Sequence, residues 1–114
     1  MRVTCRGYGG NPEALGSEDS ILSVLNEYPA KFELRVYGDP QIHRNDGTIT
    51  GFVPIVRGHV IVHVHPDVGQ MHLDVYAFNK RLDSKYMEQD LLQRFGLKKV
   101  LSNEDSDGYP LYKR

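Results

Sequence analysis

The stretch from Gly58 to Phe78, GHVIVHVHPDVGQMHLDVYAF, decides the fold. It contains two segments of alternating side chains, which a turn over residues 66–70 separates. Because successive side chains of a strand point to opposite faces, each segment has one aliphatic face and one mixed face. The aliphatic faces consist of Val60, Val62 and Val64 in the first segment and Met71, Leu73, Val75 and Ala77 in the second. The sequence therefore predicts two neighbouring strands that bury one face.

Two amphipathic helices are predicted outside this pair of strands. Ser17 is expected to cap a helix that begins at Glu18 and ends at Pro29. A second helix begins at Asp83 or Ser84, and a glycine ends it. The apolar faces, which repeat every three or four residues, comprise Ile21, Val24, Leu25 and Tyr28 in the first helix and Met87, Leu91 and Phe95 in the second. We expect both faces to pack on the aliphatic faces of the strands.

The remaining strands complete a sheet. They are predicted at residues 2–5, 32–37, 48–56 and 98–102, with a turn-rich loop over residues 38–47. Consecutive short strands joined by tight turns pair in antiparallel fashion. The predicted fold class is therefore α+β, a two-layer sandwich of a mainly antiparallel sheet with two helices on one face. We expect one domain over residues 1–102 and a polar C-terminal tail over residues 103–114.

The composition restricts the function classes. The chain has 114 residues, with 14 Lys and Arg against 15 Asp and Glu, so its formal net charge is -1. A nucleic-acid-binding protein has an excess of basic residues, and a membrane helix needs about 20 consecutive apolar residues. Because the sequence has neither, no nucleic acid and no membrane partner is expected. The beginning of the chain lacks a signal-peptide pattern, and the single cysteine, Cys5, allows no internal disulfide, so a cytoplasmic location is expected.

The second face of the two central strands mixes polar and apolar side chains. It comprises His59, Ile61, His63 and His65 of the first strand and His72, Asp74, Tyr76 and Phe78 of the second. Such a face is too apolar for free exposure to water and too polar for an ordinary core. We therefore expect a second layer to cover it, and we predict a homodimer formed through this histidine-bearing face.

The residues alone leave two interpretations of these histidines open. Histidines two apart on a strand share a face, so His63 and His65 could bind one metal ion. His72 or Asp74 of the returning strand would complete such a site, although a bare His-x-His pattern is a weak signal for metal. In the other interpretation the imidazoles are structural, and they form hydrogen bonds with neighbours such as Asp74 or with a partner subunit.

The run from Gly51 to Phe78 resembles the signature of the prokaryotic S-adenosylmethionine decarboxylases. In that family, a strand that begins with glycine leads to Ser-Glu-Ser-His and then to His-Thr-Trp-Pro-Glu. A Gly-Tyr turn and a strand from Asp to Phe-Thr-Cys-Gly follow. The positions that match in register without a gap are Gly51, His59, His63, Pro66, Gly69 and Asp74. The resemblance extends more weakly over most of the chain.

The resemblance implies a particular chemistry. Members of the family make a pyruvoyl cofactor from their own chain: a serine attacks the preceding carbonyl, an ester forms, and elimination cleaves the chain. The matching position here is Gly58, preceded by Val56 and Arg57 in place of serine and glutamate. Glycine has no hydroxyl, so the ester cannot form and no pyruvoyl cofactor is expected.

Other positions of the family pattern are changed or retained. Phe78 stands where the family has its catalytic cysteine, and His65 stands where it has a tryptophan. The retained processing positions, which we regard as vestigial together with Gly58, are Thr50, His59 and His63. A conformational role for Gly58, as a turn glycine between two strands, stays open.

The resemblance predicts a protein related to S-adenosylmethionine decarboxylase that neither self-processes nor catalyses decarboxylation. It is expected to be a ligand-binding or regulatory homologue linked to the biosynthesis of polyamines such as spermidine. The expected ligand-binding residues are His59, His63, Asp74 and Tyr76. The expected partners are a second copy and an active decarboxylase paralogue. The alternatives are an assembly protein without a ligand and a metal-dependent enzyme that uses the face of His59, His63, His65 and His72.

Overall fold

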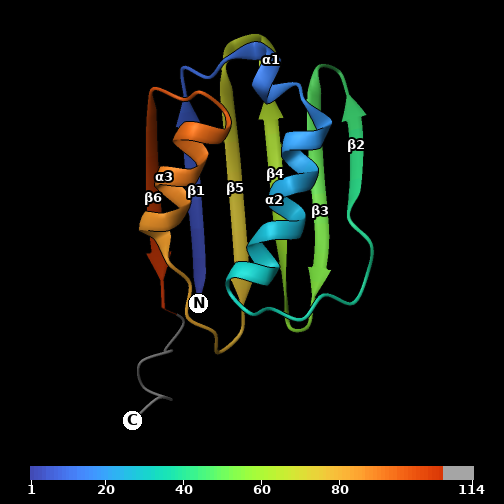
Figure 1. Cartoon of the computed structure of the whole chain (residues 1–114), viewed down its shortest axis with the longest axis vertical. Coiled ribbons are helices and arrows are strands. Elements are labelled where there is room, and N and C mark those ends of the chain that lie inside the picture. Colours follow the sequence, from blue (N-terminus) through green and yellow to red (C-terminus); the bar gives the residue numbers. More distant parts are fainter. Residues whose placement is uncertain (107–114) are drawn as a thin grey trace.

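The computed structural model describes residues 1–106, which form one six-stranded sheet with helices. In chain order the elements are β1 (Arg2–Tyr8), α1 (Pro12–Leu15), α2 (Glu18–Lys31), β2 (Gln41–Asn45), β3 (Thr48–Ile55), β4 (Gly58–His65), the 3-10 turn η1 (Pro66–Val68), β5 (Gln70–Ala77), α3 (Ser84–Arg94) and β6 (Lys99–Asp105). The strands lie in the order β2-β3-β4-β5-β1-β6, and every neighbouring pair is antiparallel (Figure 1). The first strand of the chain therefore lies between β5 and β6.

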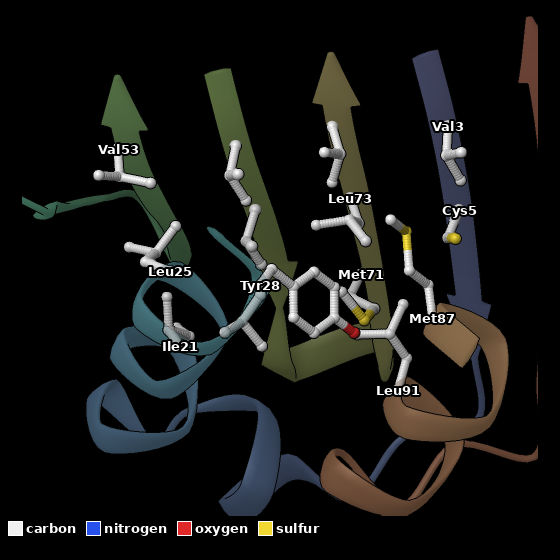
Figure 2. Packing of buried hydrophobic residues seen from close by; sticks show 14 of the residues in the cluster. Val3, Cys5, Ile21, Leu25, Tyr28, Val53, Met71, Leu73, Met87 and Leu91 are labelled. Carbon is white, nitrogen blue, oxygen red and sulfur yellow. The ribbon is translucent and has the colours of Figure 1, made fainter. Parts of the chain in front are cut away.

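The core lies between the sheet and the two longer helices. Both α2 and α3 pack on the same face of the sheet (Figure 1). Figure 2 shows Ile21 and Leu25 of α2 and Met87 and Leu91 of α3 together with side chains of the strands. The predicted aliphatic faces of β4 and β5 are buried, with exposed fractions of 0% to 3%. The α+β sandwich predicted from the sequence is confirmed.

A group of polar side chains links the two helices. The Tyr28 side chain is fully buried, and its hydroxyl donates a hydrogen bond to Asp90 Oδ2 at 2.7 Å. Arg94 donates to both oxygens of Asp90, at 3.0 and 2.9 Å, and to Glu27 at 2.8 Å. Burial, with the hydrogen bond to Asp90, raises the pKa of Tyr28, so the hydroxyl stays a donor. This network holds α2 against α3.

The predicted helix starts are confirmed, whereas one helix end is wrong. Ser17 and Asp83 each accept a hydrogen bond from a backbone N–H in the first turn of their helix. The expected end at Pro29 is wrong, because α2 continues to Lys31. A proline in the last turns removes only its own N–H bond. Its carbonyl accepts the N–H of Leu34 at 2.7 Å, which closes the end of the helix.

The prediction of a strand at residues 32–37 is wrong. The structure has an isolated bridge to β3 there, and the strand β2 lies instead within the predicted loop of residues 38–47. The cause is a tight turn at Asp46 and Gly47, whose φ angles are 50° and 80°. Such a turn joins two antiparallel strands directly, so it pairs the residues just before it with β3.

The last strand is longer than predicted. β6 ends at Asp105, so residues 103–105 of the expected tail pair with β1. Residues 107–114 of that tail lie outside the described residues. The division into a domain and a tail stays a prediction. Within residues 1–106, no helix is long and apolar enough to cross a membrane.

Candidate functional site

The sheet face opposite the two longer helices, called the histidine face from here on, is formed by alternating side chains of four central strands. Its members are Thr48, Thr50, Phe52 and Pro54 of β3, His59, Ile61, His63 and His65 of β4, His72, Asp74 and Tyr76 of β5, and Arg2, Thr4 and Arg6 of β1. The members on β3, β4 and β5 are all half-buried. The residues that alternate with them on β4 and β5, from Val60 to Val64 and from Met71 to Ala77, point to the other face and are buried. The predicted alternation of the two faces is confirmed.

One part of the histidine face is a row of paired histidines. The antiparallel register places Thr50 opposite His63, and His63 opposite His72. Thr50 Oγ1 lies 2.9 Å from His63 Nδ1, and Thr48 Oγ1 lies 3.1 Å from His65 Nδ1. The rings of His63 and His72 are stacked, with centroids 6.4 Å apart.

This row favours a neutral His63. Burial lowers the pKa of His63, and the neighbouring His72 and His65 lower it further, against a smaller opposing effect of Asp74. A neutral imidazole can accept one hydrogen bond and donate another. The row therefore suits polar contacts with neutral groups.

The other part is a charged cluster at the Gly58 end of β4. His59 Nε2 lies 3.4 Å from Asp74 Oδ2, and Arg2 Nε lies 3.3 Å from Asp74 Oδ1. The guanidinium of Arg2 also lies over the ring of Tyr76, 5.2 Å from its centroid. Within residues 1–106, His59 Nε2 and Asp74 Oδ1 are inaccessible to water and complete no hydrogen bond. Their nearest partners are the ion-pair contacts within the cluster, Asp74 Oδ2 for His59 Nε2 and Arg2 Nε for Asp74 Oδ1.

The arrangement of the histidines does not support the metal-dependent alternative. Among residues 1–106, no three His, Cys, Asp or Glu side chains are placed to hold one ion. His63 and His65 each have one ring nitrogen beside a threonine hydroxyl, and His72 stacks on His63. A zinc site needs three or four converging ligands.

Gly58 begins β4 directly after a tight turn, opposite Ala77 of β5. A Cβ atom at Gly58 would lie 1.9 Å from the carbonyl oxygen of Tyr76. The preceding residue, Arg57, has a φ of 62°, in the left-handed region. The backbone of β5 thus leaves no room for a side chain at this position.

The predicted site residues fall into two separate groups. His59, Asp74 and Tyr76 lie together at the Gly58 end, where the rings of His59 and Tyr76 are 6.1 Å apart. His63 and Thr50 lie about 16 Å along the strands from Gly58 and about 13 Å from His59, whereas Asp74 lies about 7 Å from the paired His63 and His72. Within one chain, the retained processing positions are therefore not brought to one place.

Sequence reasoning missed Arg2 and Thr48 as members of this face. Arg2 stands opposite Tyr76 in the register, and Thr48 pairs with His65 through its hydroxyl. Alternation along the first strand places Arg2, Thr4 and Arg6 on one face, which was the available signal. The partner strand of β1, however, depends on the order of strands in the sheet, which alternation does not determine.

Comparison with known proteins identifies the family. The family model described as S-adenosylmethionine decarboxylase matches residues 1–107, so the chain belongs to the S-adenosylmethionine decarboxylase family. The S-adenosylmethionine decarboxylase proenzyme of Archaeoglobus fulgidus is 32% identical over 70 residues, which are 61% of this chain and 62% of that protein. The proenzyme of Pyrococcus abyssi is 24% identical over 87 residues, 76% of this chain and 63% of that protein. The chain thus covers less than two thirds of these relatives.

A solved structure shows the same fold. The crystal structure of the adenosylmethionine decarboxylase from Aquifex aeolicus VF5 is similar with a TM-score of 0.70 and 19% sequence identity. The match covers 90% of this chain and 84% of that one. It agrees with the antiparallel sheet and one-sided helices described above.

Proposed function

We propose that this chain is a member of the S-adenosylmethionine decarboxylase family that does not self-process, forms no pyruvoyl group and is catalytically inactive. The single observation that carries the proposal is Gly58. The position lacks the hydroxyl that attack on the preceding carbonyl requires, and a Cβ there would meet the Tyr76 carbonyl oxygen at 1.9 Å. Both the nucleophile and the space for it are missing.

The retained hydroxyl of Thr50 offers no substitute in the same chain. It is held at 2.9 Å from His63, about 16 Å along the hairpin from Gly58. A nucleophile must lie within about 3.5 Å of the carbonyl carbon that it attacks. The chemistry implied for the relatives named as proenzymes therefore has no reacting group here.

Mass spectrometry under denaturing conditions tests this proposal. The 114-residue chain is expected as one species near 13.0 kDa. Two fragments, residues 1–57 and residues 58–114, would overturn it, and so would decarboxylation of S-adenosylmethionine by the purified chain. Incubation for days at neutral pH makes the measurement sensitive to slow processing.

The proposed role is binding or regulation linked to polyamine biosynthesis, with spermidine as an end product. The proposed ligand-binding residues are His59, His63, Asp74 and Tyr76. The support is the cluster at the Gly58 end of the histidine face, where a guanidinium, an imidazole, a carboxylate and an aromatic ring lie together in Arg2, His59, Asp74 and Tyr76. A ligand that binds the folded state raises the melting temperature. We expect such a shift with S-adenosylmethionine, its decarboxylated form or spermidine, and a smaller shift in Asp74→Asn; no shift with any of them contradicts the binding role.

The proposal includes a homodimer that covers the histidine face in the cytoplasm, or a complex with an active decarboxylase paralogue. Phe52, Ile61 and Tyr76 give the face a half-buried apolar part, and sheets that bury such faces are stable as pairs. Cys5 is buried and has no disulfide partner, as expected in a reducing compartment. Light scattering at micromolar concentration should give a dimer, and Ile61→Lys should give a monomer. A monomeric wild-type chain would exclude the homodimer.

A further inference from the structure

A separate cavity lies at the end of the sheet where β3 turns into β4, past the last residue of β5. Its volume is about 650 Å³. The lining residues that matter here are Glu33, Arg35, Arg57, Phe78, Asn79 and Lys80. They come from the segment after α2, from the β3–β4 turn and from the segment after β5. The cavity is thus formed by three connections that are distant in the sequence, and it adjoins the histidine face at Tyr76.

The cavity is cationic. Arg35, Arg57 and Lys80 supply three positive charges, against one carboxylate from Glu33. Within residues 1–106, none of the three cations lies within 4.0 Å of a carboxylate oxygen, whereas Arg2, Arg44 and Arg94 all do. The three groups therefore keep their capacity to bind an anion.

The same place is also apolar. Phe78 is 41% exposed, and the guanidinium of Arg57 lies over its ring, 5.5 Å from the centroid. Val56, also in the lining, is 46% exposed, and its N–H donates to the carbonyl of Arg35. A smaller adjoining cavity of about 390 Å³ is lined by Arg57, Tyr76 and Phe78. A flat or apolar group thus has a ring and an aliphatic side chain to pack against.

The backbone around the cavity is unusual. Glu33, Arg57 and Asn79 have φ angles of 57°, 62° and 57°. The value at Glu33 follows from the end of α2, and asparagine tolerates this region. Neither explanation applies to Arg57. It lies in a tight turn, at a position where the positive φ favours glycine. A residue with a side chain, kept in a backbone conformation that favours glycine beside a cavity, is a candidate for a functional role.

We propose that this cavity binds an organic anion, whose phosphate or carboxylate group is held by Arg57, Arg35 and Lys80 and whose flat or apolar part packs on Phe78. The excess of positive charge disfavours polyamines at this place. The site needs an intact bond between Arg57 and Gly58, so the inference rests on the proposed absence of self-processing.

Four probes separate the contribution of the anionic group from that of the flat part of the ligand. They are adenosine 5′-monophosphate, inorganic phosphate, adenosine and spermidine. Each is titrated into the 114-residue chain, and amide shifts are followed by NMR. We expect saturable shifts at residues 33–35, 56–57 and 78–80 with adenosine monophosphate. Its affinity should exceed that of adenosine by at least about tenfold, since a charge-assisted contact distinguishes the two. If inorganic phosphate binds as tightly as adenosine monophosphate, the anion site is supported, but a contribution of Phe78 to binding is excluded.

Charge reversal completes the test. Arg57→Glu should lower the affinity for adenosine monophosphate by about tenfold or more, while the affinity for adenosine is unchanged. Arg35→Gln gives a second variant outside the strained turn, and Lys99→Glu at the opposite end of the sheet is the control. The proposal is overturned by equal affinity for adenosine and its monophosphate, by spermidine shifts at the same amides, or by unchanged binding in both arginine variants. None of these results alters the outcome of the mass measurement.

Discussion

Replacement of Gly58 by serine should not restore self-processing, and it should destabilise the fold. A Cβ at this position lies 1.9 Å from the carbonyl oxygen of Tyr76. The two strands must separate by about 1.1 Å or more to reach the shortest contact that carbon and oxygen tolerate. The neighbouring hydrogen bond from the Phe78 N–H to the Arg57 carbonyl, now 3.1 Å long, is then lost with the end of the β4–β5 ladder.

The magnitude follows from these contacts. One or two backbone hydrogen bonds contribute about 1 kcal/mol each, and a buried carbonyl without a partner costs about 1–3 kcal/mol, so we expect a loss of about 2–5 kcal/mol in the free energy of unfolding. Urea unfolding measures this loss, and denaturing mass spectrometry reports cleavage. Because the clash comes from the Cβ, Gly58→Ala should lose about as much as Gly58→Ser.

Gly47→Ser is the control at an open turn, where an added Cβ has no atom within 4 Å but φ is 80°. It should cost no more than about 1–2 kcal/mol. A Gly58→Ser chain as stable as the wild type would refute the steric argument. A chain that splits into residues 1–57 and 58–114 would show that the hydroxyl was the only missing part.

Two further predictions concern buried polar groups. Tyr28→Phe should lower the free energy of unfolding by about 1–2 kcal/mol, since Asp90 loses the hydrogen bond from the hydroxyl but keeps those from Arg94; an unchanged urea midpoint would contradict this. The pKa of His63 is lowered from its usual 6.5. As the pH falls from 6.5 through the lowered pKa, the unfolded chain binds more protons than the folded chain, so His63 reduces the free energy of unfolding. Above pH 6.5, His63 has no such effect. His63→Gln should therefore flatten the pH dependence of the urea midpoint below pH 6.5, and an equal slope in both chains would count against the assignment.

Much of the fold was predictable because local patterns and burial agree. The valines of β4 and the aliphatic residues of β5 alternate strictly, and these faces became the floor of the core. Ser17 and Asp83 marked both helix starts through capping. The segment of residues 32–37 also alternates, but the turn at Asp46 and Gly47 pairs residues 41–45 with β3 instead. Alternation alone does not show which of the two segments pairs with β3. The geometry of the turn, and not the alternation of side chains, therefore determines which residues form β2.

The shared face of most candidate residues was predictable from the sequence, but Arg2, Thr48 and the contacts between the residues were not. The alternation placed His59, Asp74 and Tyr76 on one face, and the structure agrees. Arg2 joins them only because β1 lies next to β5, a contact across 74 positions in the sequence. The closeness of the Tyr76 carbonyl to Gly58 is likewise a property of strand pairing that no residue type encodes.

The position of β1 has a consequence for any cut in the chain between Arg57 and Gly58. The half before that bond would contain β1 and β3, and the half after it would contain β4, β5 and β6. Because β1 is inserted between β5 and β6, while β4 lies beside β3, the two halves are interlocked by three strand pairings. A severed chain would keep the shape and hydrodynamic size of an intact one, so native gel filtration is blind to cleavage and only separation in denaturant can reveal it.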